Sequence, residues 1–463
     1  MTLLLLIVAL AAPEPAPLPE LWSVEAAAPA PVSADPWWQS WDDPALSAAM
    51  QDAFDGNFDL AAAVGRAEQA RGLAQQALSP LLPNITADGS FQTAPLNTLG
   101  FQFGGLGPQD PNAPKLYWLG SALLSAQLNL DVFGRDVLNA QAAQRDRRAA
   151  EANLDEAAVA LASAIATGWY DVALHHERLR LLEAQVEANR TVLELTELRF
   201  QHSEATTVEL LQQRQNLAST EALLPSARAA LTIAQQQTAV LLGRAPSNAP
   251  PGMPTRLPDP PALPSLGSPS DLLLHRPDLR AGAERADAAR QRRLAAERGF
   301  LPSFGVQGSA GWQLFNAGQF REVLGWNIGV NASIPIFDAG RAIASLKQAR
   351  ATEHIEVATW RSSTLAAAQQ VEAALARDTE QRDRLVSLRA QTQAAKSAFD
   401  TSRRRYAEGV EAYLPTLTAL VAWQSAELNL LQARRDAIDA RVRLHEALGG
   451  PWTRKLHAAG DPR

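Results

Sequence analysis

Residues 135–201 read RDVLNAQAAQRDRRAAEANLDEAAVALASAIATGWYDVALHHERLRLLEAQVEANRTVLELTELRFQ, with no proline and with Gly168 as the only glycine. At about 1.5 Å per residue, this stretch predicts one helix roughly 100 Å long. Alanine is abundant in it, which favours close helix approach and a wide, thin-walled packing. Such a helix cannot fold back into a compact core, so it needs neighbours along its whole length.

The sequence carries the same plan twice, which is the first property to test in a long chain. A second stretch without glycine or proline lies between Gly340 and Tyr406. Five short matches keep their order in the two halves: Asp59–Ala67 with Asp278–Ala286, Leu82-Pro83 with Leu301-Pro302, Val132-Phe133 with Ile336-Phe337, Arg199-Phe200 with Arg405-Tyr406, and Leu242-Gly243 with Leu448-Gly449. Each half therefore predicts a short helix, two strands, a very long helix, a sharp turn and a return helix.

The pattern also predicts the bounds of these elements. The short helices are expected at 59–79 and 277–299, and the return helices at 206–242, opened by the capping box Thr206-Thr-Val-Glu209, and from Pro415 to Leu448. The Pro-rich stretch between the repeats predicts a linker. We divide the chain into a signal peptide (1–11), an N-terminal extended segment (12–58), repeat 1 (59–243), an equatorial linker (244–276), repeat 2 (277–450) and a C-terminal tail (451–463).

Four stretches alternate between polar and apolar residues, namely 84–91, 121–130, 304–312 and 326–334. This period of two is typical of a barrel strand with a wet interior and an apolar exterior, although each strand alone also fits an ordinary soluble hairpin. Four strands cannot close a pore by themselves, so a membrane role requires several chains. Aromatic residues near the expected strand ends predict anchors at a membrane interface: Tyr117, Trp118, Trp312 and Trp326.

Composition excludes some classes of function. The 463 residues carry a formal charge of −7 and no long Lys/Arg run, which argues against nucleic-acid binding. There is no cysteine, so disulfides and lipidation of an N-terminal cysteine are excluded. The apolar run Leu3–Ala12, with Ala9-Leu10-Ala11 as a cleavage pattern, predicts a signal peptide, and we expect no transmembrane helix after it.

The sequence shows no constellation of catalytic residues. His175-His176-Glu177 lacks the i, i+4 spacing that places two imidazoles on one helix face, so a solvated surface is favoured over a metal site. Gly104-Gly105-Leu-Gly107 lacks the lysine and hydroxyl residue of a phosphate loop and fits a hairpin tip. We expect no enzyme activity, no cofactor and no metal.

Several motifs resemble those of the TolC-like outer-membrane efflux factors, in the nodulation-type branch that serves RND efflux pumps. They occur in the family's order between about residues 35 and 455: Asp43-Pro44-x-Leu46 with Asn57-x-Asp59-Leu60, Arg276-Pro277-Asp278-Leu279-Arg280, Ile336-Phe337-Asp338-Ala339-Gly340-Arg341, Tyr406-x-x-Gly409-x-x-x-Tyr413-Leu414, and Leu448-Gly449-Gly450-x-Trp452.

The resemblance implies a mixed α+β membrane protein that assembles as a homotrimer. Four strands per protomer build a twelve-stranded β-barrel in the outer membrane, joined to an α-helical coiled-coil tunnel in the periplasm. Its partners are outer-membrane lipid, a periplasmic adaptor (membrane fusion) protein and an inner-membrane RND-type pump. The function implied is a passive exit duct for small molecules such as drugs or toxic compounds.

The resemblance also implies a gate, or an adaptor contact, at the periplasmic tips. The residues that map there are Arg199, Phe200, Ser203, Glu209, Arg405, Tyr406, Gly409, Glu411, Tyr413 and Leu414. Glu209 and Glu411 are candidates for charged lumen positions, the alternative being exposed acids at a helix start. Thr418 stands where the family usually has Asp, which argues against a full acidic ring. Ser203 stands where the second tip has Gly409.

Two other functions remain open at this point. An outer-membrane duct for type I protein secretion uses the same architecture with different partners. A periplasmic coiled-coil scaffold explains the Ala-rich helices, but it does not explain the export signal or the paired alternating strands.

Overall fold

The computed structural model describes residues 15–22, 33, 35–95, 116–247, 252–316 and 320–453. The expected signal peptide, the glycine-rich segment at 104–107 and the tail after Thr453 lie outside these residues. Contacts divide the chain into two compact units. Unit 1 contains Ala67–Ala150 and Gly282–Trp360, and unit 2 contains Pro15–Arg66, Glu151–Ala281 and Arg361 onward. Each unit therefore draws on both sequence repeats.

Both halves contain the expected order of elements. The first half has α2 (Phe58–Gln76), β1 (Asn84–Pro95), β2 (Leu116–Leu130), α4 (Arg135–Gln201), α5 (Thr207–Glu221) and α6 (Leu223–Leu241). The second half has α8 (Pro277–Arg298), β3 (Ser303–Asn316), β4 (Phe320–Ser333), α9 (Arg341–Ala407) and α10 (Tyr413–Leu448). The two long helices predicted from the absence of proline are present, and each has 67 residues.

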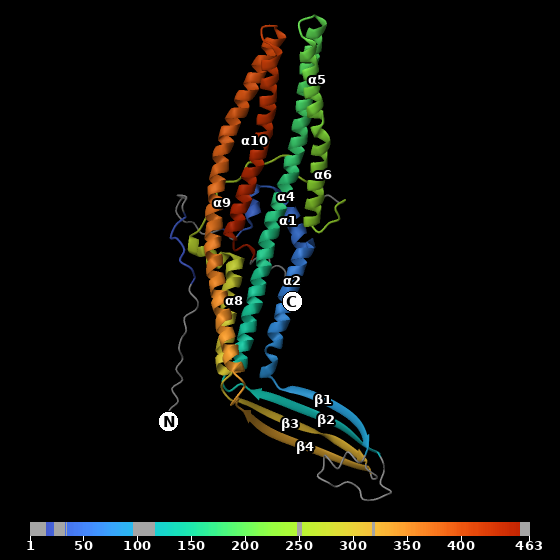
Figure 1. Cartoon of the computed structure of the whole chain (residues 1–463), viewed down its shortest axis with the longest axis vertical. Helices are drawn as coiled ribbons and strands as arrows, with labels where there is room; N and C mark the ends of the chain where they lie inside the picture. Colours follow the sequence, from blue (N-terminus) through green and yellow to red (C-terminus); the bar gives the residue numbers. More distant parts are fainter. Residues whose placement is uncertain are drawn as a thin grey trace. The chain divides into compact units, whose positions relative to one another are not determined.

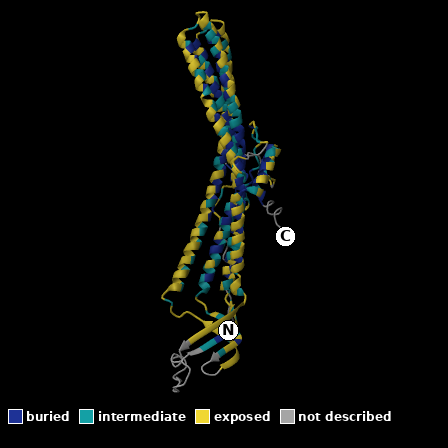
Figure 2. Cartoon of the chain, turned by 90° about the vertical axis from the view of Figure 1, so that its right-hand side faces the viewer, coloured by how far each residue is buried: buried dark blue, intermediate teal, exposed yellow. Residues whose placement is uncertain are grey.

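The four strands form one antiparallel sheet in unit 1, in the order β1-β2-β3-β4 (Figure 1). The register pairs Ile85 with Ala126, Ala126 with Gly308 and Gly308 with Ile328, so odd-numbered residues of β1 share a face with even-numbered residues of β2, β3 and β4. One face carries large, exposed apolar side chains: Ile85, Phe91, Leu124, Trp312, Leu324, Trp326, Ile328 and Val330. Exposed residues predominate along the strands in Figure 2, so this chain alone leaves the apolar face uncovered.

The strands are longer than the alternation predicted. Because β4 begins at Phe320, Trp326 lies near the middle of that strand and not at its end, as we expected. Trp118 lies close to the end of its strand, where its ring is 5.9 Å from Phe91 and 5.8 Å from Phe320, centroid to centroid. Tyr117 belongs to β2, but its side chain lies outside the described part of the chain.

Aspartates begin both long helices at the end of the sheet. Asp131 accepts a hydrogen bond from the amide of Val137 at 2.8 Å. In the second half, Asp338 accepts from the amides of Gly340 at 3.0 Å and Ala342 at 2.8 Å. Each carboxylate satisfies helix amides that have no partner within the helix, which explains why α4 and α9 start where they do.

The segment 12–58, expected to be extended, contains the helix α1 (Pro44–Gly56) and the 3-10 turn η1 (Trp37–Trp41). Asp43 accounts for this difference. One of its oxygens accepts from the amide of Leu46 at 2.9 Å, and the other accepts from the indole of Trp169 on α4 at 3.0 Å. Together with Pro44 at the first helical position, this cap starts a helix that the extended reading missed.

Tryptophans from both ends of the chain pack together in unit 2. Trp38 meets Trp452 edge to face at 4.9 Å between centroids. Trp37 stacks on the imidazole of His445 at 5.0 Å and 14°. Burial and the neighbouring charge of Arg441 lower the pKa of His445 to about 3. The N-terminal segment is thus attached to α10 by aromatic contacts around a neutral histidine.

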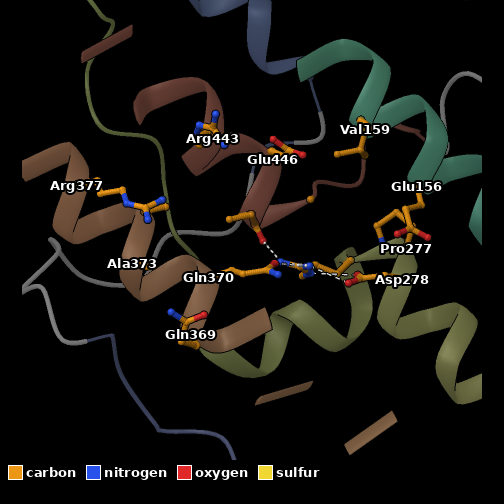
Figure 3. Close-up of a pocket in the computed structure, with 15 residues that line it drawn as sticks. Glu156, Val159, Pro277, Asp278, Gln369, Gln370, Ala373, Arg377, Arg443 and Glu446 are labelled. Atoms are coloured by element: carbon orange, nitrogen blue, oxygen red, sulfur yellow. Dashed lines mark hydrogen bonds and ion pairs between the residues drawn. The ribbon is translucent and has the colours of Figure 1, made fainter. Parts of the chain in front are cut away.

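Arg276 joins three elements of unit 2, and two of its partners, Asp278 and Gln370, are labelled in Figure 3. Its guanidinium makes two hydrogen bonds with Asp278, at 2.8 and 3.1 Å, at the start of α8. It also donates to the carbonyl of Ala447 at 2.8 Å and to the amide oxygen of Gln370 on α9 at 2.9 Å. Arg276 and Asp278, from the second-half motif, thus fix the chain where the linker ends. That linker, expected at 244–276, ends in two short helical turns, η4 (Pro269–Asp271) and α7 (Leu272–His275).

The return helices of the two halves differ. The predicted helix 206–242 is divided at Ala222 into α5 and α6, whereas α10 is continuous over 36 residues. Pro225 explains the division, because proline has no amide to donate to the carbonyl of Glu221. α10 has Pro415 at its third position, within the first turn, where a missing amide costs nothing.

By length and composition, α4 contains an 18-residue window that qualifies as a candidate membrane span. From the sequence we had expected no such helix. Within that window 67% of the residues are buried inside the protein. Trp169, Tyr170 and Ile165 are among the largest buried side chains of α4. The apolar window is therefore part of the core of unit 2.

Candidate functional site

The candidate site consists of two helix tips in unit 2, where α4 turns into α5 and α9 turns into α10 (Figure 1). Both turns have the same hydrogen-bond pattern. In the first, the amide of Glu204 donates to the carbonyl of Arg199 at 2.8 Å; in the second, that of Val410 donates to the carbonyl of Arg405 at 3.0 Å. These 6→1 bonds define a Schellman ending in both tips.

The residue that reverses the chain is different in the two tips. Gly409 has φ 77° in the second tip, and Ser203 has φ 58° in the first. The left-handed region costs a non-glycine residue about 1–2 kcal/mol relative to glycine. The first tip therefore reaches the same geometry at a higher conformational cost.

The helices that leave the tips are capped differently. Thr206 accepts from the amide of Glu209 at 3.3 Å, and the Glu209 carboxylate accepts from the amide of Thr206 at 3.4 Å. This is the capping box that the sequence predicted. The residue before α10 is Ala412, which has no side chain able to cap the helix. Each tip therefore has one stabilising feature: the first has a capping box at the start of α5, and the second has a glycine at its turn.

Arg199 joins the two tips to each other. Its guanidinium lies 4.4 Å from the centre of the Tyr406 ring and donates a hydrogen bond to the Tyr406 carbonyl. The Arg199 side chain is 13% exposed, and Tyr406 is buried. A cation stacked on an aromatic ring away from water gives a strong contact. The resemblance grouped Arg199 with Tyr406, and the structure brings them together.

Below the tips, a buried network of amide side chains connects the same helices. The hydroxyl of Tyr413 on α10 donates to Gln213 on α5 at 2.9 Å, and Gln213 donates to the carbonyl of Asn189 on α4 at 2.8 Å. Asn189 in turn donates to Thr220 at 3.1 Å. All these residues are buried, so loss of one partner leaves another unsatisfied.

Burial also affects the two tip tyrosines, whose rings lie 5.9 Å apart. Desolvation raises the pKa of both Tyr406 and Tyr413 above the ordinary value, and the Glu209 carboxylate acts in the same direction. The two phenols are therefore neutral at physiological pH and serve as hydrogen-bonding and stacking groups.

The acids proposed for the lumen have partners of their own. Glu411 lies 3.3 Å from the guanidinium of Arg405, whose side chain is 57% exposed. Glu209 is held in its capping box, and the hydroxyl of Thr418 donates to the carbonyl of Leu414 at 2.9 Å. Glu411 and Arg405 thus form a local pair within the second tip, whereas Arg199 reaches across from the first tip to the second.

The end of the tips also exposes apolar side chains. Phe200 and Val208 flank the first turn, and Val410 and Leu414 flank the second. A group of apolar side chains at the end of a helical bundle is a surface suited to contact with another protein. Phe200 and Leu414 were named among the predicted tip residues, and Val208 and Val410 lie within the same two tip segments, 199–208 and 405–414.

In the described part of the chain, no group of three or more His, Asp or Glu residues is placed to hold a metal ion. Some ion pairs connect helices, such as that between Arg441 on α10 and Asp378 on α9, where two hydrogen bonds measure 2.9 and 3.1 Å.

A family model described as outer membrane efflux protein matches residues 49–244 and 268–450. Among curated proteins, the chain is 30% identical over 425 residues to the pyoverdine export outer membrane protein OpmQ of Pseudomonas aeruginosa, covering 90% of this chain and 87% of that protein. It is 26% identical over 422 residues to nodulation protein T of Rhizobium leguminosarum bv. trifolii, covering 90% and 88%.

The fold is also present among solved structures. The outer-membrane channel OprN superposes with a TM-score of 0.84 at 26% identity, covering 96% of this chain and 99% of that one. The superposition therefore extends over nearly the whole chain.

Proposed function

The chain belongs to the outer membrane efflux protein family, and from that membership we propose that it is the outer-membrane channel subunit of a tripartite efflux system. Three copies, each with four strands, close a twelve-stranded barrel in the outer membrane, and the long helices continue the conduit into the periplasm. The chain is a passive duct, and energy and choice of cargo come from its partners.

The observation that carries this proposal is the two-faced sheet. One face presents apolar side chains such as Trp326 at 77% and Ile328 at 73% exposure, and the other presents amides and hydroxyls. Among the described residues, β1 and β4 have no neighbour on their outer sides. A lipid bilayer satisfies the apolar face, and copies of the same sheet satisfy the two free edges.

We propose that the tips close the conduit and meet the partner proteins. The Arg199–Tyr406 contact holds the two hairpins together in the closed form, and the Arg405–Glu411 pair stabilises the turn of the second hairpin. A periplasmic adaptor docks on the apolar residues around the turns, and an inner-membrane RND-type pump supplies the cargo. By similarity to OpmQ, which is named for pyoverdine export, we propose small molecules as the cargo.

Expression of the full chain, followed by gel analysis of isolated outer membranes with and without boiling, tests the proposal. We expect a band near three times 49.8 kDa that converts to the monomer on heating, because a closed barrel resists detergent until its edges separate. A soluble periplasmic species without an outer-membrane fraction would refute the channel and favour a coiled-coil scaffold.

A second measurement separates efflux from protein secretion. Deleting the chromosomal copy should increase the accumulation of a fluorescent small-molecule dye, and the wild-type chain should restore its export. Loss of a secreted protein, with dye accumulation unchanged, would instead assign the duct to type I secretion.

A further inference from the structure

Three arginines surround an open depression of about 490 Å³ in unit 2, where the linker lies on α4 and α10. The residues that line it are Glu177, Arg180, Leu181, Arg256, Leu257 and Arg434. The depression thus holds three guanidiniums and one carboxylate. Because the whole chain carries a formal charge of −7, this excess of positive charge is a local feature of the surface.

The single carboxylate of the depression is occupied in holding the linker. Glu177 on α4 accepts a hydrogen bond from the amide of Leu257 at 2.8 Å. Arg434 on α10 donates to the carbonyl of Leu257 at 2.6 Å and to Glu177 at 2.9 Å. Leu257 is buried beneath them, with 4% of its surface exposed. Glu177 and Arg434 therefore balance each other and fix the linker backbone between two helices.

The other two arginines keep their positive charge. Arg180 on α4 donates to the carbonyl of Thr255 at 2.6 Å, a contact that leaves its charge uncompensated. Arg256 follows Thr255 and precedes the buried Leu257, so its exposed side chain extends from a backbone that is held on both sides. Over the residues that the structure describes, neither Arg180 nor Arg256 has a carboxylate partner.

The acids nearest to these arginines in the sequence pair with other residues. Glu183, one turn further along α4, lies 3.8 Å from Arg228 on α6. Asp259, further along the linker, lies 3.2 Å from Arg389 on α9. The depression therefore presents a surplus of two guanidiniums that the described part of the chain does not neutralise.

We propose that this depression binds an acidic segment of a partner protein. Guanidiniums such as those of Arg180 and Arg256 recognise carboxylates through two parallel hydrogen bonds. Small-molecule sites enclose most of their ligand, whereas both arginines are exposed beside an open depression. Such a surface suits an extended chain that carries several carboxylates.

This docking surface goes beyond the proposed channel function and does not depend on it. Arg180 precedes the end of α4 at Gln201 by about 20 residues, which is roughly 30 Å along the helix. The surface is therefore distinct from the tips, where we propose that the adaptor docks. A partner bound at the linker can contact the protein while the tips are occupied.

The purified full-length protein allows a direct test with a defined probe. The probe is a peptide of six glutamates with an uncharged dye, and its binding is followed by fluorescence anisotropy at about 50 mM salt, where charge contacts are weakly screened. We expect saturable binding, and no binding of a matching peptide of six lysines. Arg256→Gln should weaken binding by about fivefold or more, because it removes one guanidinium from the surface.

Arg190→Gln is the matched control. Arg190 is on α4, its side chain is 52% exposed, and it pairs with Glu221 at 2.8 Å. The variant removes the same formal charge away from the depression and should change the affinity by less than about twofold. Arg180→Gln is a second variant within the depression, where we again expect about fivefold weaker binding.

Three results would overturn the inference: no saturable binding of the glutamate peptide, equal losses in Arg256→Gln and Arg190→Gln, or displacement of the peptide by inorganic phosphate at comparable concentration. The last result would assign the depression to small anions. The heat-modifiable band and dye export are measured on the same variants, and Arg256→Gln should leave both unchanged. Failure of the peptide to bind a protein that forms the band refutes the docking surface alone, whereas absence of the band refutes the channel alone.

Discussion

The two helix tips have the same backbone and different side chains. The first tip, with Ser203, bears a conformational cost at its turn and gains a capping box at Thr206. The second tip has Gly409 at its turn and Ala412 without a cap. The comparison teaches that the hydrogen-bond pattern of the helix end sets the turn geometry. The first tip supports this geometry through the cap of the helix that follows, and the second tip supports it through the glycine at the turn.

Both tips depend on the packing of the helices that carry them. The largest effect that we expect is a loss of this packing at low pH. The pKa of His445 is about 3 in the folded chain, below the ordinary value of 6.5. The unfolded chain binds the proton more readily, so stability falls as pH drops from about 6.5 towards 3, by about 1.4 kcal/mol per pH unit. Thermal unfolding followed by circular dichroism at pH 7 and pH 4.5 measures this loss.

His445→Phe is the matched control, because it keeps an aromatic ring beside Trp37 and removes the titration. Its unfolding temperature should change much less between the two pH values. An equal loss in both proteins would assign the acid sensitivity to other groups.

The next largest effect separates the two arginines of the tips. Arg199→Ala removes a buried stacking contact and a charged hydrogen bond, which together are worth about 2–3 kcal/mol. Arg405→Ala removes an exposed ion pair worth less than about 1 kcal/mol. Hydrogen exchange of the turn amides, measured by mass spectrometry on the full-length protein, should accelerate by about 30-fold or more in the first variant and by less than about fivefold in the second. Similar acceleration in both would remove Arg199 as the link between tips.

Tyr413→Phe tests whether the tips share a support. The change removes the hydroxyl that donates to Gln213 and leaves a buried amide oxygen without that donor, at a cost of about 1–2 kcal/mol. Exchange should accelerate in α5 as well as in α10. Tyr406→Phe, at the neighbouring buried tyrosine, is the variant for comparison. If Tyr413→Phe accelerates exchange in α10 alone, the two tips do not share this network.

Exchanging the turn residues tests the conformational difference directly. Ser203→Gly should stabilise the first tip and slow the exchange of its amides. Gly409→Ser should destabilise the second tip and speed exchange there. Each substitution should change the free energy of opening by about 1 kcal/mol. The double variant should return the sum close to zero. A destabilising Ser203→Gly would indicate that the serine side chain contributes something that the backbone geometry does not explain.

The smallest effect concerns the caps. Ala412→Ser supplies α10 with the missing side-chain acceptor and should stabilise the second tip by about 0.5–1 kcal/mol, while Thr206→Ala should weaken the first by a similar amount. Exchange at the first turn of α10 and of α5 provides the measurement. No change in either variant would mean that interhelical contacts, and not caps, fix these ends.

The sequence predicted the long helices, the order of strands and the capping box, because these depend on local signals such as missing prolines, alternation and Thr206-x-x-Glu209. It missed α1, although the cap formed by Asp43 and Pro44 is a local signal. The contact that ties this cap to α4, from the indole of Trp169, comes from a residue distant in sequence and was not visible. It also predicted strands that were too short. It ended β1 and β3 too early and started β2 and β4 too late, because paired strands continue through residues such as Val323 and Gly325 that interrupt the alternation.

The candidate site was only partly visible in the sequence. Motif order placed Arg199, Tyr406 and Tyr413 near the tips, but nothing local indicates that Arg199 stacks on a residue 207 positions later. The amide network of Asn189 and Gln213 has no sequence signature, since buried and exposed amides look alike in a helix. A polar residue at a position expected to face the core is the signal that could have found it.

The free edges of β1 and β4 have a consequence for how the protein is made. Until copies meet, each chain presents two rows of unpaired backbone groups beside an apolar surface, which is a template for aggregation as well as for assembly. Closure of the ring by mass action depends on the local concentration of newly exported chains. The rate of synthesis and the supply of holding chaperones should therefore determine the yield of channels more than the intrinsic stability of any one chain.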